Sequence, residues 1–278
     1  MVKPTAYCVR DGETLVPTAL AQGPWGQTMS GHVVGGMLAR AVERTVVDSE
    51  FQPSRLTVDM VRPAALEPTE VTTSIQRDGR RIRLVDATML QGGHVVARAS
   101  ALFLRRGEEH PDDQVWSSTV AMPPVPAEPS PPKGPLLIHS YGWGAAGAGG
   151  VVLPTEWLQA TPGQKYAWVQ HITPILDDEP LTPIVRAAMA GDLASAVAHW
   201  DGQEIKYINA DYTLSLSRLP NGAHIGLAAL TQSAHAGIAT GTVMVFDAHG
   251  EIGTGVTNAL ANPSWTAPSW AAAPEPVA

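Results

Sequence analysis

The chain has 278 residues, of which 44% are hydrophobic, so it can bury the core of one large domain or of two small ones. It carries 18 Lys and Arg against 26 Asp and Glu, and this deficit of positive charge argues against a nucleic-acid-binding surface. Its one cysteine, Cys8, cannot form an internal disulfide, and no cluster of Cys and His has the spacing of a structural zinc site.

The sequence also shows no apolar segment typical of a membrane-spanning helix or of an export signal. The longest apolar stretches are interrupted well before the roughly 18 to 20 residues that a membrane-spanning helix needs. The N-terminal sequence MVKPTAYCVRDGETL has no apolar segment like that of a signal peptide. We therefore expect a cytoplasmic protein that does not insert into membranes.

The first half of the chain predicts one helix followed by four strands. Residues 30–48 place apolar side chains on one face, and Ser30 can cap the helix. The pair Gly35 and Gly36 lies inside this helix, and two such glycines indicate that another backbone passes close by. The strands are expected at 55–62, 70–77, 81–91 and 94–105, with QGGH as the tight turn between the last two.

A proline-rich stretch separates the two halves. Residues 123–135 read PPVPAEPSPPKGP, a composition that favours extended, solvated polyproline II over helix or sheet. Residues 140–152, rich in Gly and Ala, are expected to be irregular.

The second half repeats the order of the first. A helix is expected over 181–200, with Thr182 as the cap and Pro183 at the first helical position. Strands are expected at 206–218, 224–232, 238–247 and 251–261. Aligning Arg62 with Arg218 gives a shift of 156 residues, and aligning the turn glycines Gly93 and Gly250 gives 157. The constant shift indicates an internal duplication.

A long helix packed on an antiparallel sheet, made twice, predicts an α+β protein with a double hotdog fold. The expected boundaries are 1–122 for the N-terminal hotdog, 123–152 for the linker, 153–262 for the C-terminal hotdog and 263–278 for a loose tail. A pair of ferredoxin-like domains is the alternative, but such domains need helices between strands that are here joined by turns alone. Exposed sheet edges favour further pairing, so we expect a homodimer or a higher homo-oligomer.

Several segments also resemble a known family. They are PWGQTMSGHVVGGMLARAVE, PLTPIVRAAMAGDLASAV and INADYTLSLSRLPNGAHIGLAALT, the last followed by an apolar run and FDAHGEIG. Together they resemble the type II acyl-CoA thioesterases, especially the actinobacterial thioesterase-like branch, over roughly residues 20 to 262. The resemblance implies an acyl-CoA substrate that is hydrolysed to a free acid and CoA without a metal or other cofactor.

The resemblance also implies a catalytic group. In the family an Asp, a Thr or Ser on the next strand and a Gln near the end of the last strand hold the water. Carried over by position, these are Asp211 and Thr231, with Ser233 if the register slips, while Thr257 or Asn258 stands where the Gln is expected. Backbone N–H groups at the start of the two helices are the expected donors to the oxyanion.

The residues themselves leave some roles open. The run INADYTLSLSR alternates apolar and polar side chains, and its Asp211 could instead satisfy a turn or a backbone amide. His32, Gly35 and Gly36 are assigned to the substrate cleft together with Ser233. Two further side chains of the second helix, Asp192 and Ser195, could face the cleft, but a capping or exposed position fits them equally well.

We therefore predict an acyl-CoA thioesterase in which Asp211 and Thr231 orient water and residue 257 or 258 assists. The missing Gln leaves a noncatalytic acyl-CoA or fatty-acyl binding protein as the competing hypothesis. A hydratase on the same fold is a third, and it would depend on His32 rather than Asp211.

Overall fold

The computed structural model describes residues 5–108, 116–126, 136–141, 163–200 and 206–262. The tail from 263, most of the expected proline-rich linker and most of the Gly and Ala-rich stretch lie outside these residues. In the described part of the chain, no helix combines the length and the hydrophobicity that crossing a membrane requires.

The first repeat contains α1 and four long strands, preceded by a small hairpin. Its elements are β1 (Cys8–Asp11), β2 (Thr14–Pro17), a short 3-10 helix (Ala19–Ala21), α1 (Gly31–Thr45), β3 (Phe51–Met60), β4 (Glu70–Asp78), β5 (Ile82–Gln91) and β6 (His94–Arg105). The helix and all four expected strands are present, with β6 at its expected bounds.

The second repeat has the same order with more irregularity. Its elements are β7 (Leu136–Tyr141), β8 (Tyr166–His171), α2 (Pro183–Asp192), α3 (Ala194–His199), β9 (Tyr207–Asn209), β10 (Asp211–Leu216), β11 (His224–His235), β12 (Ile238–Asp247) and β13 (Gly250–Ala261). The single long helix expected over 181–200 is therefore two helices that meet at Leu193. Strand β7 lies in the stretch assigned to the linker, and the expected strand 206–218 is divided into β9 and β10.

Eleven strands form one large sheet that both repeats share. The order is β4-β5-β6-β3-β10-β13-β12-β11-β8-β7, and β9 pairs with β13. The repeats meet where β3 pairs antiparallel with β10. There Thr57 lies opposite Thr213, and their hydroxyls are 3.0 Å apart. These two residues are separated by 156 positions, the shift that the sequence alignment gives, so equivalent residues pair at the centre of the sheet.

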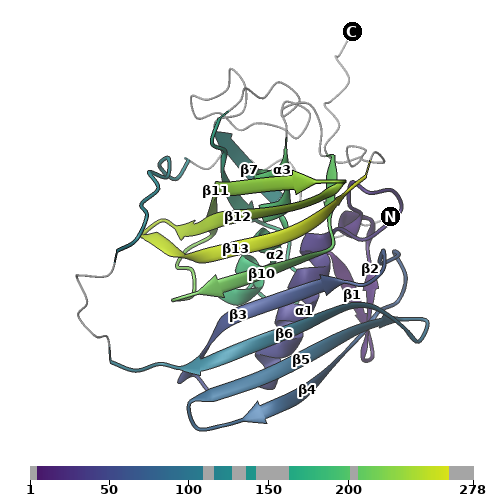
Figure 1. Cartoon of the computed structure of the whole chain (residues 1–278). Coiled ribbons are helices and arrows are strands. Elements are labelled where there is room, and N and C mark those ends of the chain that lie inside the picture. The colour runs from purple at the N-terminus through teal and green to yellow at the C-terminus, as the bar shows by residue number, and fades with distance from the viewer. Residues whose placement is uncertain (1–4, 109–115, 127–135, 142–162, 201–205, 263–278) are drawn as a thin grey trace.

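One face of the sheet packs on the helices and carries the core. In Figure 1 the sheet faces the viewer and α1 and α2 lie behind it. On β10 the alternate residues Tyr212, Leu214 and Leu216 are buried, as the period of two predicts. Asp211 and Thr213 therefore point to the opposite face of that strand.

Helices α1 and α2 run antiparallel and nearly touch. A Cβ atom at Gly35 of α1 would lie 2.0 Å from the Tyr212 hydroxyl oxygen and 3.3 Å from the carbonyl oxygen of Ala188 in α2. At Gly36 it would lie 2.8 Å from side-chain atoms of Ile175 and Met189. The expectation that another backbone passes close to this glycine pair is confirmed.

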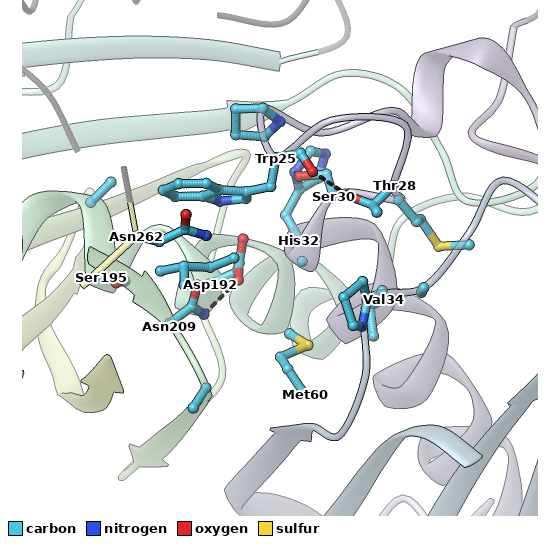
Figure 2. A pocket seen from close by; sticks show the side chains of 18 of the residues that line it. Trp25, Thr28, Ser30, His32, Val34, Met60, Asp192, Ser195, Asn209 and Asn262 are labelled. Carbon is cyan, nitrogen blue, oxygen red and sulfur yellow. Dashed lines mark hydrogen bonds between the residues drawn. The ribbon is translucent and has the colours of Figure 1, made fainter. Parts of the chain in front are cut away.

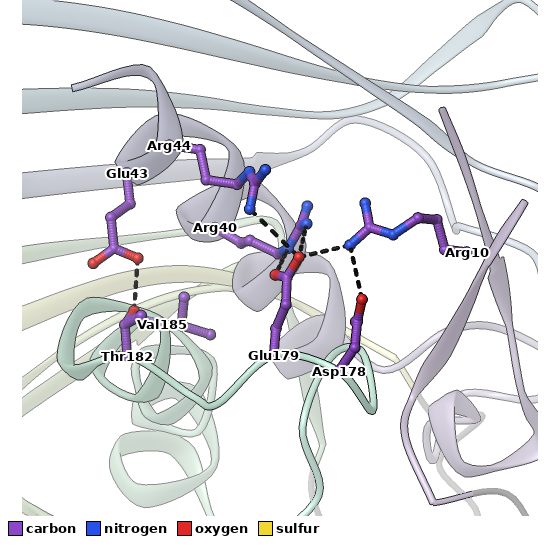
Figure 3. A network of polar contacts seen from close by, with 8 residues as sticks. All are labelled: Arg10, Arg40, Glu43, Arg44, Asp178, Glu179, Thr182 and Val185. Atoms are coloured by element: carbon purple, nitrogen blue, oxygen red, sulfur yellow. Dashed lines mark hydrogen bonds and ion pairs between the residues drawn. The ribbon is translucent and has the colours of Figure 1, made fainter. Parts of the chain in front are cut away.

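A group of ion pairs joins α1 to the loop before α2 (Figure 3). Arg40 of α1 donates to both carboxylate oxygens of Glu179, at 2.5 and 2.6 Å, and Arg10 donates to one of them at 2.6 Å. Arg44 lies 3.4 Å from the same carboxylate. The hydrogen bond from Arg40 is the largest influence that holds the pKa of Glu179 down, to about 2. This network fixes the loop that leads into α2.

Replacing Gly35 with Ala should destabilise the fold, because the new methyl group meets the Tyr212 hydroxyl. We expect a loss of about 1–3 kcal/mol of unfolding free energy in urea denaturation. The matched control is Gly107→Ala, since a Cβ there would meet nothing within 4 Å. An equal loss in both variants would contradict the close approach, and Tyr212→Phe should recover part of the Gly35→Ala loss.

Replacing Glu179 with Gln should lower the unfolding free energy at pH 7 by on the order of 1 kcal/mol. The loss is this small because the Glu179 side chain is partly exposed and solvent screens its charge. Because the folded pKa is depressed, the stabilisation is present above the ordinary pKa near 4.5 and is lost as pH falls through about 2. The difference between the two proteins, measured by urea denaturation at several pH values, should therefore narrow below pH 4.5. Asp178→Asn is the control, since its carboxylate is 63% exposed and 3.8 Å from Arg10. A difference that stays constant with pH would show that the Glu179 charge contributes nothing.

Candidate active site

A cavity of about 440 Å³ lies where the start of α1 meets the end of α2. The loop before α1, the loop after β3, and β9 complete its wall (Figure 2). Most of the lining is apolar, and a few polar groups converge on one point, which is the usual character of a small-molecule site.

The first turn of α1 is not capped by its own N-cap side chain. Ser30 is the N-cap residue, but its side chain makes no capping hydrogen bond. Its hydroxyl is instead 2.6 Å from Nδ1 of His32. A Cβ atom at Gly31 would lie 2.2 Å from Oδ1 of Asp192, so only glycine lets the carboxylate approach the helix so closely. The carboxylate of one repeat therefore faces the helix start of the other.

Asp192 is the last residue of α2 and is held by two donors. The Asn209 side chain on β9 donates to Oδ1 at 2.9 Å, and the backbone N–H of His32 donates to the same carboxylate. Burial raises the pKa of Asp192 to about 6, against the opposite effect of these two hydrogen bonds. A carboxylate with this pKa is largely ionised at neutral pH and is a stronger base than an exposed aspartate.

The histidines beside the cavity are neutral. His32 lines the cavity and is 3% exposed, and burial lowers its pKa to about 3. His171 stacks on it with ring centroids 5.5 Å apart, and its pKa is also lowered, mainly by burial. With its pKa lowered to about 3, His32 is a weak base for activating water, which does not favour the hydratase hypothesis.

The two sides of Asp192 differ in chemistry. In Figure 2, Val34 and Met60 lie to one side of the carboxylate, and Trp25, Ser195 and Asn262 lie to the other. The first side is hydrocarbon, whereas the second combines an indole ring with polar side chains. Among the described residues, no group of three or more His, Cys, Asp or Glu is placed to hold a metal ion.

Asp211 lies outside this cavity lining. Its carboxylate accepts hydrogen bonds from the backbone N–H of Asn258 at 2.8 Å and from the Asn258 amide at 2.9 and 3.1 Å. Thr257 is fully buried, and its hydroxyl donates to the backbone oxygen of Asp211 at 3.1 Å. The structure thus brings these three residues together, and Asp211 satisfies a backbone amide as the alternative interpretation expected.

The other assigned residues are spread over the fold. Thr231 is exposed on β11, with its hydroxyl 2.7 Å from that of Thr242, and Ser233 is exposed on the same strand. Gly35 and Gly36 form the contact between helices and are not part of the cavity lining. Of the residues assigned to substrate binding, His32 is the one that the structure places at the cavity.

The cavity contains polar groups that the sequence did not select. For Asp192 and Ser195 the sequence leaves a capping or exposed position as likely as the cleft, and it predicts no role for Asn209. A usable signal was present, because Asp192 is the one acid in the apolar helix segment TPIVRAAMAGD. An acid at that position needs a partner when the helix is buried.

Two family models of acyl-CoA thioesterase domains match the chain. A family model described as the acyl-CoA thioesterase N-terminal domain matches residues 21–104, and one described as the acyl-CoA thioesterase C-terminal domain matches residues 108–257. No curated protein matches the chain.

Solved structures resemble the chain over nearly its full length. The acyl-CoA thioesterase II TesB2 from Mycobacterium marinum is 20% identical, with 91% of this chain and 92% of that chain covered and a TM-score of 0.61. A protein with a hot dog fold from Alicyclobacillus acidocaldarius is 19% identical, with 92% and 95% covered and a TM-score of 0.63. The tesB protein of Mycobacterium avium subs. paratuberculosis is 14% identical, with 93% and 97% covered and a TM-score of 0.59. These likenesses show that the chain has a hotdog fold.

Replacing Asp192 with Asn should stabilise the protein at pH 8. Because the folded pKa is raised from 3.8 to about 6, the ionised carboxylate opposes folding once pH rises through 6. We expect a gain of about 1–3 kcal/mol at pH 8 that disappears near pH 4, measured by urea denaturation at both pH values. The control is Asp211→Asn, which should not stabilise the protein, since that carboxylate already has three donor contacts. A loss of stability in Asp192→Asn at pH 8 would contradict the expected cost of its charge.

Proposed function

The chain belongs to the acyl-CoA thioesterase family, and we propose that it hydrolyses a fatty acyl-CoA thioester to the free acid and CoA with Asp192 as the water-activating base. The observation that carries the proposal is the half-buried Asp192 carboxylate, which lines the cavity against the start of α1 and has a raised pKa. Strongly shifted carboxylates in such cavities are candidates for general bases.

The reaction needs a water and a place for negative charge. Asp192 takes one proton from the water as the water oxygen bonds to the thioester carbonyl carbon. The carbon–sulfur bond of the tetrahedral intermediate then breaks, and the proton passes to the sulfur of CoA. The products are a carboxylic acid and the CoA thiol, so atoms and charge balance without a cofactor.

The neighbouring groups have supporting roles in this proposal. Asn209 holds the carboxylate in position through its 2.9 Å hydrogen bond. In the first turn of α1 the backbone N–H of His32 donates to the Asp192 carboxylate, and the helix dipole favours negative charge there.

The competing candidate for the base is Asp211, the residue that the resemblance implied. It lies on β10 and is held by Asn258, and it is not among the residues that line the cavity. Thr231 and Ser233 are on β11, two strands beyond β13 in the sheet. We therefore assign the water to Asp192, and a comparison of the two aspartates tests the assignment directly.

Two further expectations stay predictions. The homodimer or higher assembly is one, and it fits the edge position of β4 within the described sheet, where Ile75 is 53% exposed. The cytoplasmic location is the other.

Asp192→Asn should reduce acyl-CoA hydrolysis at least a hundredfold, since it removes the base and keeps the shape of the side chain. The measurement is thiol release from acyl-CoAs of short to long chain, with Asp211→Asn assayed beside it and expected to retain most activity. For the wild type, kcat/KM should fall about tenfold per pH unit below pH 6 and stay level above it.

Two results would contradict the assignment in different ways. A large loss in Asp211→Asn with little change in Asp192→Asn would return the catalytic role to the group on β10 and β13. No thiol release from the wild type, with a higher melting temperature in the presence of an acyl-CoA, would favour the noncatalytic acyl-binding protein.

A further inference from the structure

Ser195 presents a buried hydroxyl to the cavity. It lies in the first turn of α3, is 4% exposed and lines the cavity. Within the described residues its Oγ has no hydrogen-bond partner. A buried hydroxyl normally has a partner, because losing water without replacement is unfavourable.

The local helix does not use this hydroxyl. Serines inside helices often donate to the carbonyl three or four residues back, and for Ser195 those residues are Asp192 and Gly191. The Ser195 hydroxyl donates to neither carbonyl. The hydroxyl is therefore available to a molecule that enters the cavity.

The opposite side of the cavity has no comparable group. Val34 and Met60 lie there in Figure 2, and buried Met29, Ala64 and Val96 also line the cavity. The Thr28 hydroxyl donates to the carbonyl of Trp25 at 3.2 Å, so it is already satisfied. The buried lining is thus apolar on one side of Asp192, where Arg62 is an exposed charged member of the lining, and has an unsatisfied hydroxyl on the other.

A thioester of CoA has the same asymmetry about its carbonyl carbon. The acyl chain is mostly hydrocarbon, whereas the pantetheine chain carries amide groups. We infer that Ser195 hydrogen-bonds a carbonyl or amide group of the bound thioester, while the acyl chain extends along the side of Val34 and Met60. This inference rests on the proposed function, and it makes Ser195 a substrate-binding residue rather than a base.

Two parts of a substrate could supply that polar group. Pantetheine amides are present in every acyl-CoA, and an oxygen function on the acyl chain is present only in hydroxyacyl or oxoacyl substrates. The chemistry at Ser195 is the same in both cases, so the source is settled by comparing ligands that differ only in the acyl part.

The test is calorimetric binding of nonhydrolysable thioether analogues to wild type, Ser195→Ala and Ser49→Ala. One analogue carries a plain alkyl chain on CoA, and the second carries the same chain with a 3-hydroxyl group. The exposed Ser49, outside the cavity lining, makes a matched serine control, and its variant should bind both analogues as the wild type does. Ser195→Ala should weaken binding about three- to tenfold, the range for one hydrogen bond.

The pattern across the ligands identifies the partner. If Ser195→Ala binds both analogues more weakly by the same factor, Ser195 bonds the pantetheine chain. If only the hydroxylated analogue binds more weakly, Ser195 bonds the acyl chain. Unchanged binding of both analogues to Ser195→Ala, or no binding to the wild type, overturns the inference. The melting temperature of Ser195→Ala should be unchanged or higher, whereas a serine needed for structure would lower it.

Binding and turnover separate this inference from the proposed function. The analogues do not require a working base, so the Ser195 result stands even if the wild type releases no thiol from acyl-CoA. Conversely, hydrolysis that depends on Asp192 in a protein whose analogue binding ignores Ser195 would support the proposed function alone. With hydrolysable substrate, the loss in Ser195→Ala should appear mainly in KM.

Discussion

The near contact between α1 and α2 is the constraint on which the rest of the structure depends. The helices run antiparallel, and side-chain-free positions at Gly31 and Gly35 allow Asp192 and Ala188 to approach α1. Such an approach has a cost, because glycine inside a helix is less stable than alanine by about 1 kcal/mol. Because of this approach, the C-terminal end of α2 lies against the N-terminal end of α1, and the Asp192 carboxylate lies beside backbone N–H groups.

The duplication produces this arrangement at both ends of the helix pair, with different results. At the second end Thr182, the cap of α2, donates to Glu43 of α1 at 2.7 Å, as Figure 3 shows. Thr182 also accepts from the backbone of Val185, so that helix start is closed by its own cap. At the first end the Ser30 hydroxyl is engaged with His32, and α1 begins at the cavity. The two repeats share a fold, but the start of α2 is capped by its own Thr182, whereas the start of α1 is capped by Asp192 of the other repeat.

Much of this fold could be predicted from the sequence, because periodicity and duplication are local signals. The shift of 156 residues even identifies Thr57 and Thr213, the pair at the centre of the sheet. The helix break at Leu193 could not be predicted, since Ala and Val continue the apolar pattern past it. It is a tertiary effect, set by the packing of α3 on β11, β12 and β13.

The site was harder to predict, because sequence alternation shows which residues share a face but not where a cavity lies. Tyr212 and Leu214 are buried toward the helices, so Asp211 lies on the other face of β10. The alternation of the strand predicts that face, and the catalytic role that the resemblance implies for Asp211 stays a prediction. The position of Asp192 could not be predicted in this way, because it depends on a tertiary contact. One would need to know which side chain from a distant part of the chain lies against the start of α1.

The environment of Asp192 balances two requirements of the base that we propose it to be. Burial raises its pKa to about 6, which strengthens it as a proton acceptor by roughly two powers of ten over an ordinary aspartate. The hydrogen bonds from Asn209 and from the backbone of His32 act in the opposite direction and keep the carboxylate mostly ionised at pH 7. Without these donors, burial would favour the protonated acid, which cannot accept a proton from water. With full solvation, the carboxylate would be ionised but a weaker base. The helix contact therefore sets both the place of the charge and its strength.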